Sequence, residues 1–240
     1  MNSREGMDGG TMELQHPELI ISDFDRTLAY LYRNERLLSE LAEEICDYYS
    51  AYLSIDSALY TIDGYKAWHS LHRMAESRYD HEKAMEINEQ AERLVTAFEF
   101  RVMEHTPFFD NVIETIKHLH RAGIQLMIVS SNSDRVIRYA LERENIVHCF
   151  SHIIGRVIPF DPDRIKPSPY PIEQGLRYTN AEKKNIWYVG DDIVDVEAAT
   201  ACGIIPIGVA SGKHSAHQLK ARGAVFAVEG FADIITLIKE

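Results

Sequence analysis

The segment LIISDFDRTL, residues 19–28, decides the fold class, because a short apolar run leads directly into Asp23 and Asp25. Such a run suits a strand buried on both faces of a parallel sheet, although its periodicity alone does not exclude a helix. Similar runs recur along the chain, the last of them weaker: residues 124–132, 153–158, 185–192, 204–212 and 224–228. The sequence therefore supplies six candidate strands, the first of which ends in two carboxylates.

Amphipathic segments of helical length lie between these runs. Residues 111–121 repeat apolar side chains every three or four positions and stop shortly before Gly123, a helix-terminating signal. Residues 134–144 and 193–202 are also typical of helices, and the latter segment ends before Gly203. Strands that alternate with helices predict a parallel sheet covered on both faces. The predicted fold class is therefore α/β, with a Rossmann-like parallel sheet.

Residues 32–106 interrupt this alternation with helical spacing and no convincing strand. The block is too long for a crossover, so we interpret it as a smaller all-helical domain inserted into an α/β core of residues 18–31 and 107–240. Residues 31–34 and 104–107 would be its hinges. Tyrosines gather early in this region, at positions 30, 32, 48, 49, 52, 60, 65 and 79. Their density favours a helix–helix core, with a substrate-facing surface as the alternative.

The composition is that of a globular protein with an acidic surface. Lys plus Arg total 25 and Asp plus Glu total 37, which gives a formal charge of −12 over 240 residues. Such a chain repels phosphate backbones and anionic lipids, so we expect neither nucleic acid nor membrane as a partner. A small phosphorylated ligand remains compatible with this charge where a metal ion or local cations supply a positive field.

The cysteines and the N-terminal segment indicate a cytoplasmic protein. Cys46, Cys149 and Cys202 lie far apart and form no C-x-x-C pair, which favours a reducing compartment. No apolar run approaches the roughly 20 residues that span a bilayer. Residues 1–17 are polar, lack the apolar core of a secretion signal and are expected to be a flexible leader. The alternative starting residues are Met1, Met7 and Met12.

Polar side chains gather where the predicted strands end, which is the edge at which open α/β sheets bind ligands. They are Asp23, Asp25, Ser130, Ser131, Asn132, Lys166, Asp191, Asp192 and Asp195. Clustered carboxylates raise one another's pKa unless a cation lies among them, and ligands that are all oxygen suit Mg²⁺ better than zinc. A metal, anion donors and a spare carboxylate together describe a phosphoryl-transfer site.

Each of these signals also has a structural explanation. Asp191 and Asp192 could simply cap the helix that follows them, and Lys166 could be a solvated lysine. Their order, each at the end of an expected strand, favours the site. Two histidine pairs, His69 with His72 and His214 with His217, share helical faces but have no third ligand nearby in sequence. We expect those four side chains to be solvated.

At these residues the chain resembles the haloacid dehalogenase superfamily of phosphotransferases, from Ile20 to the C-terminus apart from the insert. DFDRTL (23–28), IVSS (128–131), KPSP (166–169) and GDDIVD (190–195) resemble its four motifs in order. The helical insert is similar to the C1-type cap of that superfamily. The segments KPSPYPIEQGL and AATACGIIPIGVASG most resemble its phosphoglycolate phosphatase-like branch.

The resemblance implies a Mg²⁺-dependent phosphatase acting on a small phosphorylated metabolite. Asp23 would attack phosphorus and form an aspartyl phosphate, and Asp25 would be the general acid and base. The Asp23 carboxylate, the Asp25 backbone carbonyl and Asp191 would hold Mg²⁺. Ser130 and Lys166 would hold the phosphoryl oxygens.

Further residues are assigned supporting or substrate-binding roles by the same resemblance. Ser131 and Asn132 are candidate substrate contacts, Asp195 would position Lys166 or a metal-bound water, and Asp192 could share the metal role. Arg26 stands where this branch commonly has glycine. It either contacts an anionic leaving group or is a tolerated surface substitution, and the sequence leaves both open.

Two alternatives share these motifs. A phosphomutase of the β-phosphoglucomutase kind would use the same core residues, and a non-enzymatic module would bind a phosphometabolite without turnover. Lys66, His69 and Arg73 in the insert are candidates to meet the leaving group. The physiological substrate is left open, as is the choice between a monomer and a homodimer.

Overall fold

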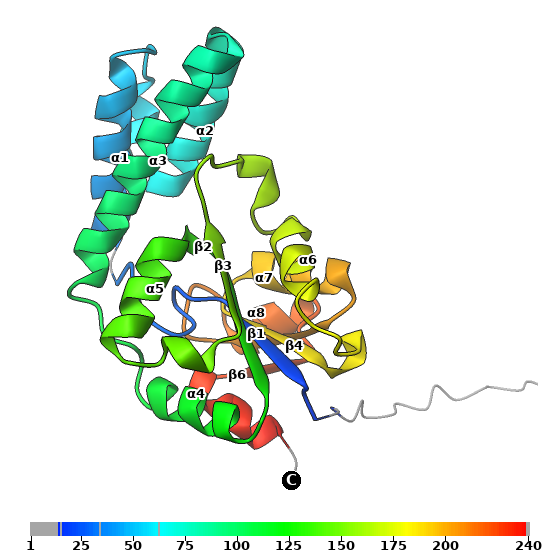
Figure 1. Ribbon diagram of the computed structural model, residues 1–240. Coiled ribbons are helices and arrows are strands. Elements are labelled where there is room, and N and C mark those ends of the chain that lie inside the picture. The colour runs from blue at the N-terminus through cyan, green and yellow to red at the C-terminus, as the bar shows by residue number, and fades with distance from the viewer. Residues whose placement is uncertain (1–13, 15, 34, 62, 239–240) are drawn as a thin grey trace, which may run out of the picture.

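A computed structural model describes the chain at residues 14, 16–33, 35–61 and 63–238 (Figure 1). Of the predicted leader, residues 1–17, it describes only the last few positions. Met1, Met7 and Met12 lie outside the described residues. None of the helices in the described part of the chain combines the length and apolar character that crossing a bilayer requires.

Six parallel strands form one sheet, in the spatial order β3-β2-β1-β4-β5-β6. They are β1 (Leu19–Ser22), β2 (Gln125–Ser133), β3 (His152–Arg156), β4 (Ile186–Gly190), β5 (Ile205–Val209) and β6 (Phe226–Val228). Each of them coincides with or overlaps one of the six predicted runs. The predicted α/β fold class with a parallel sheet is confirmed.

Helices cover both faces of the sheet, because its strands are apolar on both sides. Ile20 of β1 packs in one cluster with α4 (Val112–Arg121) and α5 (Asp134–Arg143). Leu19 and Ile21, which point to the opposite face, pack with α6 (Tyr170–Leu176) and α7 (Ile193–Cys202). The short helix α8 (Ala216–Ala221) contacts α7 and β5 on that second face. Figure 1 shows these two helical layers on either side of the strands.

Three helices fill the block that interrupts the alternation, and we refer to them together as the bundle. They are α1 (Glu35–Ser50), α2 (Gly64–Arg78) and α3 (His81–Met103), with a short 3₁₀ turn, η1 (Ser57–Thr61), between the first two. Asp63 and Asp80 cap α2 and α3, each through its side chain. The bundle stands at one end of the sheet (Figure 1). That it is a separate domain with boundaries at 32 and 106 remains a prediction.

The early tyrosines serve both of the roles that the sequence left open. Tyr48 and Tyr49 of α1 donate hydrogen bonds to α3, at the Ile87 carbonyl (3.0 Å) and the Asn88 side chain (2.8 Å). These contacts join helix to helix. Tyr65, at the start of α2, instead lines the cavity described below.

Ile21 offers a test of this packing, because it is fully buried in the central strand β1. Ile21→Ala should lower the free energy of unfolding by about 2–5 kcal/mol, since it leaves a cavity under α6 and α7. Val157→Ala is the control: that side chain is exposed, and its loss should change stability by less than about 0.5 kcal/mol. Urea denaturation measures both values, and equal effects would contradict the assigned core.

Candidate active site

The sheet topology brings the predicted polar residues to one edge. Strand β1 lies between β2 and β4, and Ser22 pairs in register with Ile128 and with Val189. Asp23 therefore comes level with the ends of its two neighbouring strands, beside Ser130 and Asp191. Lys166 follows β3 and reaches the same place from the next strand along. The crevice expected at the carboxyl ends of parallel strands is present here.

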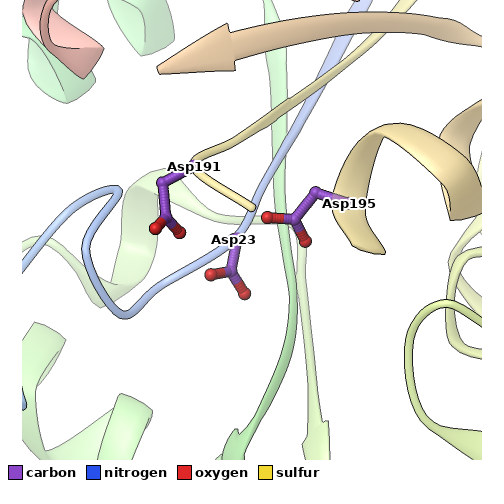
Figure 2. Close-up of side chains that lie close together, drawn as sticks. All are labelled: Asp23, Asp191 and Asp195. Carbon is purple, nitrogen blue, oxygen red and sulfur yellow. The ribbon is translucent and has the colours of Figure 1, made fainter. Parts of the chain in front are cut away.

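Three buried carboxylates meet at this edge. Asp23, Asp191 and Asp195 each offer one oxygen such that all three atoms lie within 4.8 Å of one another. Figure 2 shows the carboxylates converging from β1, from the end of β4 and from α7. Burial, with the charges of the neighbouring aspartates, raises the pKa of Asp191 well above its usual value. A bound cation would remove this penalty, because it stabilises the ionised form.

Asp191 has the free ligand atom that a metal site needs. Its Oδ2 is buried and finds no hydrogen-bond partner among the described residues. The backbone of Gly212 passes so close that a methyl group there would overlap the Asp191 carboxylate. A buried carboxylate oxygen without a partner is costly unless an ion pairs with it, so the donor set fits a hard, oxygen-ligated cation.

Lys166 is buried between two of these carboxylates. Its ammonium donates to Asp23 Oδ1 and Asp195 Oδ1, both at 2.6 Å, and to the Tyr188 hydroxyl at 3.0 Å. Burial alone would lower the pKa of Lys166, but Asp195 and Asp23 together raise it well above its usual value. The side chain is therefore protonated, and all three of its N–H groups are engaged. Asp195 holds it in place, one of the two roles expected for that residue.

Asp25 differs from Asp23 in its surroundings. Its Oδ1 accepts a hydrogen bond of 2.7 Å from the Leu31 amide. Burial and the nearby Asp23 raise the pKa of Asp25 to about 7, while the Arg26 guanidinium and the backbone donors act in the opposite direction. A carboxyl group with such a pKa can both donate and accept a proton near neutral pH.

Arg26 adopts a left-handed backbone conformation, with φ of 59°. Its Nε lies 4.0 Å from Asp25 Oδ2, is buried, and has no hydrogen-bond partner among the described residues. Ser211 donates a hydrogen bond to the Arg26 carbonyl and so fixes this turn. The side chain lines the cavity and is mostly buried, so it is not a surface substitution.

The last residues of β2, 130–133, lie where its pairing with β3 shifts register, and we refer to this irregular end of the strand as the β2 loop. It is ordered by its own side chains. The Ser130 hydroxyl donates to Asn132 Oδ1 at 3.1 Å, and the Asn132 amide donates back to Ser130 Oγ at 3.3 Å. The Ser131 carbonyl accepts a hydrogen bond of 2.8 Å from Arg156. All three loop residues line the same cavity.

Asp192 takes the capping role that the sequence offered as an alternative. Its side chain accepts from the Val194 amide at 3.3 Å, and its own amide donates to Asp195 Oδ2 at 3.1 Å. Asp192 is thus the N-cap of α7, where it forms a capping box with Asp195. Asp191 is not part of that box and lies among the site carboxylates instead. A share of Asp192 in metal binding stays a prediction.

A cavity of about 300 Å³ joins these groups to the bundle. The site aspartates and Lys166 line one side of it. The other side consists of bundle and loop residues: Tyr32, Leu38, Asp63, Tyr65, Lys66, Trp68, His69 and Phe160. The Trp68 and Phe160 rings stack with centroids 4.3 Å apart. The cavity thus has a charged floor and a largely aromatic wall.

Two of the three insert candidates for leaving-group contact reach this cavity. Lys66 and His69 line it, whereas Arg73 forms an ion pair with Asp163 on the surface and does not. The expectation that His72 is solvated is wrong, because Phe160 packs edge-on against its ring and leaves it 4% exposed.

Sequence reasoning missed a group of residues above the floor: Trp68, Glu92, Glu99, Arg156 and Phe160. The spacing of Glu92 and Glu99 carried a usable signal, because both stand on the apolar face of α3, beside Ala91, Val95 and Phe98. Charged residues on such a face are buried only with a partner. The arginine at the end of β3 is that partner.

The fold and site together define an α/β enzyme whose chemistry lies at the carboxyl edge of a parallel sheet. Residues 20–209 match the family described as haloacid dehalogenase-like hydrolase, and the chain belongs to this family. It is therefore a hydrolase, as the resemblance implied.

Relatives of known name agree with this assignment. The chain is 25% identical over 154 residues to a phosphoglycolate phosphatase of Haemophilus influenzae, in a match that covers 64% of this chain and 67% of that protein. It is 25% identical over 130 residues to the pyrophosphatase PpaX of Anoxybacillus flavithermus, covering 54% of this chain and 59% of the relative.

Solved structures share the fold. CbbY from Rhodobacter sphaeroides, in complex with phosphate, superposes with a TM-score of 0.64 at 18% identity, covering 92% of this chain and 99% of that one. A hydrolase from Pseudomonas syringae gives 0.63 at 19% identity, covering 92% and 97%. The likeness extends across the bundle as well as the sheet.

His69 allows a direct test of the cavity wall. Burial, followed by the positive charge of Arg156 and by His72, lowers the pKa of His69 from 6.5 to about 4, although Asp63 acts in the opposite direction. The folded state therefore resists protonation, and through this side chain it loses stability as the pH falls from 6.5 towards 4. Titration by NMR should place the imidazole midpoint near 4. A midpoint at the ordinary histidine value of about 6.5 would contradict the half-buried position of His69 in the cavity wall.

Proposed function

We propose that this haloacid dehalogenase-family phosphatase is Mg²⁺-dependent and hydrolyses a small phosphomonoester through an aspartyl phosphate formed on Asp23. The observation that carries the proposal is the position of Asp23. Its carboxylate lies at the floor of the cavity, with Lys166 at 2.6 Å on one side and the partnerless oxygen of Asp191 on the other. The phosphatase names of its relatives support the same chemistry.

Asp23 and Asp25 divide the reaction between them. An Asp23 oxygen attacks phosphorus, the bond from phosphorus to the ester oxygen breaks, and Asp25 gives its proton to that oxygen. A water then attacks the phosphoryl group, the bond to Asp23 breaks, and Asp25 takes the proton from the water. The pKa of Asp25, raised to about 7, suits both transfers.

Donors around the floor hold the phosphoryl oxygens. Ser130, Asn132 and the amide of Ser131 line the cavity beside Asp23, and Lys166 lies against its carboxylate. Charged and polar donors fixed before the substrate arrives stabilise the charge that develops in the transition state. Arg26, whose buried Nε lacks a partner, would meet an anionic group of the leaving alcohol.

Asp23, Asp191 and the backbone carbonyl of Asp25 would hold Mg²⁺. The free Asp191 oxygen and the oxygen-only donor set fit this ion. When bound, Mg²⁺ supplies positive charge that offsets the repulsion between the Asp23 carboxylate and a phosphate anion. Lys166 and Asp195 remain paired with each other beside it, and so keep Asp195 from acting as a further ligand.

The bundle is the candidate C1-type cap, since Lys66, His69 and the aromatic wall belong to the leaving-group side of the cavity. A cavity of about 300 Å³ suits a small metabolite. The net charge of −12 argues against nucleic acid and anionic membranes as partners, and three free, buried cysteines favour the cytoplasm. A monomer and a homodimer both remain compatible with this proposal.

Phosphate release tests the proposal. Wild-type protein should liberate inorganic phosphate from an aryl phosphate and from a panel of sugar, glycolate, nucleotide and amino-acid phosphates, and excess chelator should stop it. Asp23→Asn should lower kcat by at least about 10³-fold, because the amide is not a nucleophile. Asp163→Asn, an exposed aspartate, is the matched control.

The outcomes separate the candidate functions. An isomeric sugar phosphate without free phosphate would point to a mutase, and binding of a phosphate ester without turnover would point to a binding module. Wild-type rates in the Asp23→Asn protein would overturn the nucleophile assignment.

Gly212 gives a test of the metal that leaves every acidic residue in place. Gly212→Ala puts a methyl group into the Asp191 carboxylate, which must move. We expect the dissociation constant for Mg²⁺, measured by calorimetry, to rise about 10–100-fold. Gly230→Ala is the control, since only the far end of Asp233 lies near the added methyl, at 3.6 Å. Equal Mg²⁺ affinity in both variants would remove Asp191 from the metal site.

A further inference from the structure

A second buried ionic cluster lies above the cavity floor, where the bundle meets the sheet. Its centre is Arg156, the last residue of β3, whose side chain is 1% exposed. The guanidinium donates from Nε to Glu92 at 2.7 Å and in a fork to both oxygens of Glu99 at 3.0 Å. It also donates to the Ser131 carbonyl at 2.8 Å and to Thr96 Oγ1 at 3.4 Å. All five of its N–H groups are thereby used.

Glu99 of α3 connects this cluster to the loop at the end of β2. Its Oε2 accepts from the Ser133 amide at 3.0 Å, and its Oε1 accepts from the Asn132 side-chain amide at 3.2 Å. The Tyr65 hydroxyl donates to Oε1 at 2.5 Å from the start of α2. One fully buried carboxylate thus receives hydrogen bonds from β3, from the loop and from the bundle.

The free-energy cost of burying the charges of Arg156, Glu92 and Glu99 suggests that the cluster has a role besides stability. Burying three charges is expensive, and apolar side chains of similar volume often stabilise a fold as well or better. The cluster is also imperfect, because Glu92 Oε2 is buried without a partner and burial raises the pKa of that residue. Apolar contacts are not directional, whereas hydrogen bonds to a carboxylate fix the amide groups of the loop at set positions.

We infer that Glu99 is a positioning residue, through which the bundle holds residues 130–133 in the conformation that presents Ser130 to a phosphoryl group. The chain of contacts runs from Arg156 to Glu99, from Glu99 to Asn132, and from Asn132 to the Ser130 hydroxyl. The position of α3 against the sheet and the affinity of the site for phosphate then depend on each other. The inference rests on the proposed function, in which Ser130 is a phosphoryl donor.

Loss of a positioning residue should affect kinetics differently from loss of a residue in the cavity wall that selects substrates. Lys66 and His69 face the leaving group, so their loss should affect substrates unequally. Glu99 lies behind the loop and acts on the phosphoryl end that every substrate shares. Its loss should therefore weaken the binding of all phosphate esters by a similar factor, including a small aryl phosphate.

The first experiment compares Glu99→Gln with Glu86→Gln, an exposed ion-paired glutamate on the same helix. Glu99→Gln should raise KM for every substrate by about tenfold or more, because charge-assisted bonds to the loop are lost, and Glu86→Gln should leave KM unchanged. Hydrogen exchange at the amides of residues 131–134 should accelerate in the Glu99→Gln protein alone.

A double-mutant cycle with Ser130→Ala separates positioning from general structural support. If Glu99 acts through Ser130, the KM of the double variant should lie within about twofold of that of Ser130→Ala. Multiplicative effects of the two substitutions would overturn the inference. So would KM values and loop exchange in Glu99→Gln that match those of Glu86→Gln.

Hydrogen exchange in the wild-type protein tests the same coupling without depending on whether a variant folds. With Mg²⁺ present, inorganic phosphate should slow hydrogen exchange in residues 130–134 and in the segment of α3 around Glu99 over the same concentration range. Protection of the loop with no change in α3 would overturn the coupling. A wild type that neither turns over phosphate esters nor binds phosphate would instead overturn the proposed function.

Discussion

The contact between Lys166 and the carboxylates of Asp23 and Asp195 is the interaction on which the site depends. Six aspartates line one cavity, and the Lys166 ammonium lies directly between two of them. Its three hydrogens are divided between Asp23, Asp195 and Tyr188, so none is left for Asp191. The buried Asp191 Oδ2 is consequently left without a hydrogen-bond partner among the described residues. The position of the lysine thus determines where a cation can bind.

Sheet topology makes this contact possible. Because all six strands are parallel, their carboxyl ends meet at one edge, and the order β3-β2-β1-β4 places β1 between the two strands that contribute Ser130 and Asp191. The parallel sheet and the polar residues at its edge could be predicted from the sequence, since each polar signal followed an apolar run and the runs alternated with helices, whereas the order of the strands comes from the structure. Ile193–Cys202 was placed correctly for the same reason: a capping signal precedes it and Gly203 ends it.

What the sequence could not predict depends on contacts between distant segments. The ion pair of Arg156 with Glu99 joins residues 57 positions apart, and no local pattern says which charged residue on an apolar helical face meets which strand. His72 was expected in solvent because no third metal ligand lies near the pair His69 and His72 in sequence, yet Phe160 from the loop after β3 covers it. Periodicity identifies the face that a helix buries, and tertiary packing decides what that face contacts.

The two buried clusters carry an excess of negative charge on either side of the cavity. Below it, Lys166 is paired with Asp23 and Asp195 while Asp191 lies beside them, and above it Arg156 is paired with Glu92 and Glu99. A phosphate anion entering between them meets these carboxylates as well as Arg26, Lys66 and Lys213, the further cations that line the cavity. In the proposed function, a metal ion at the free oxygen of Asp191 would add positive charge at the floor. If the cation is held as proposed, the surplus of carboxylates makes phosphate bind more tightly in its presence, because the Lys166 ammonium is already paired with Asp23 and Asp195.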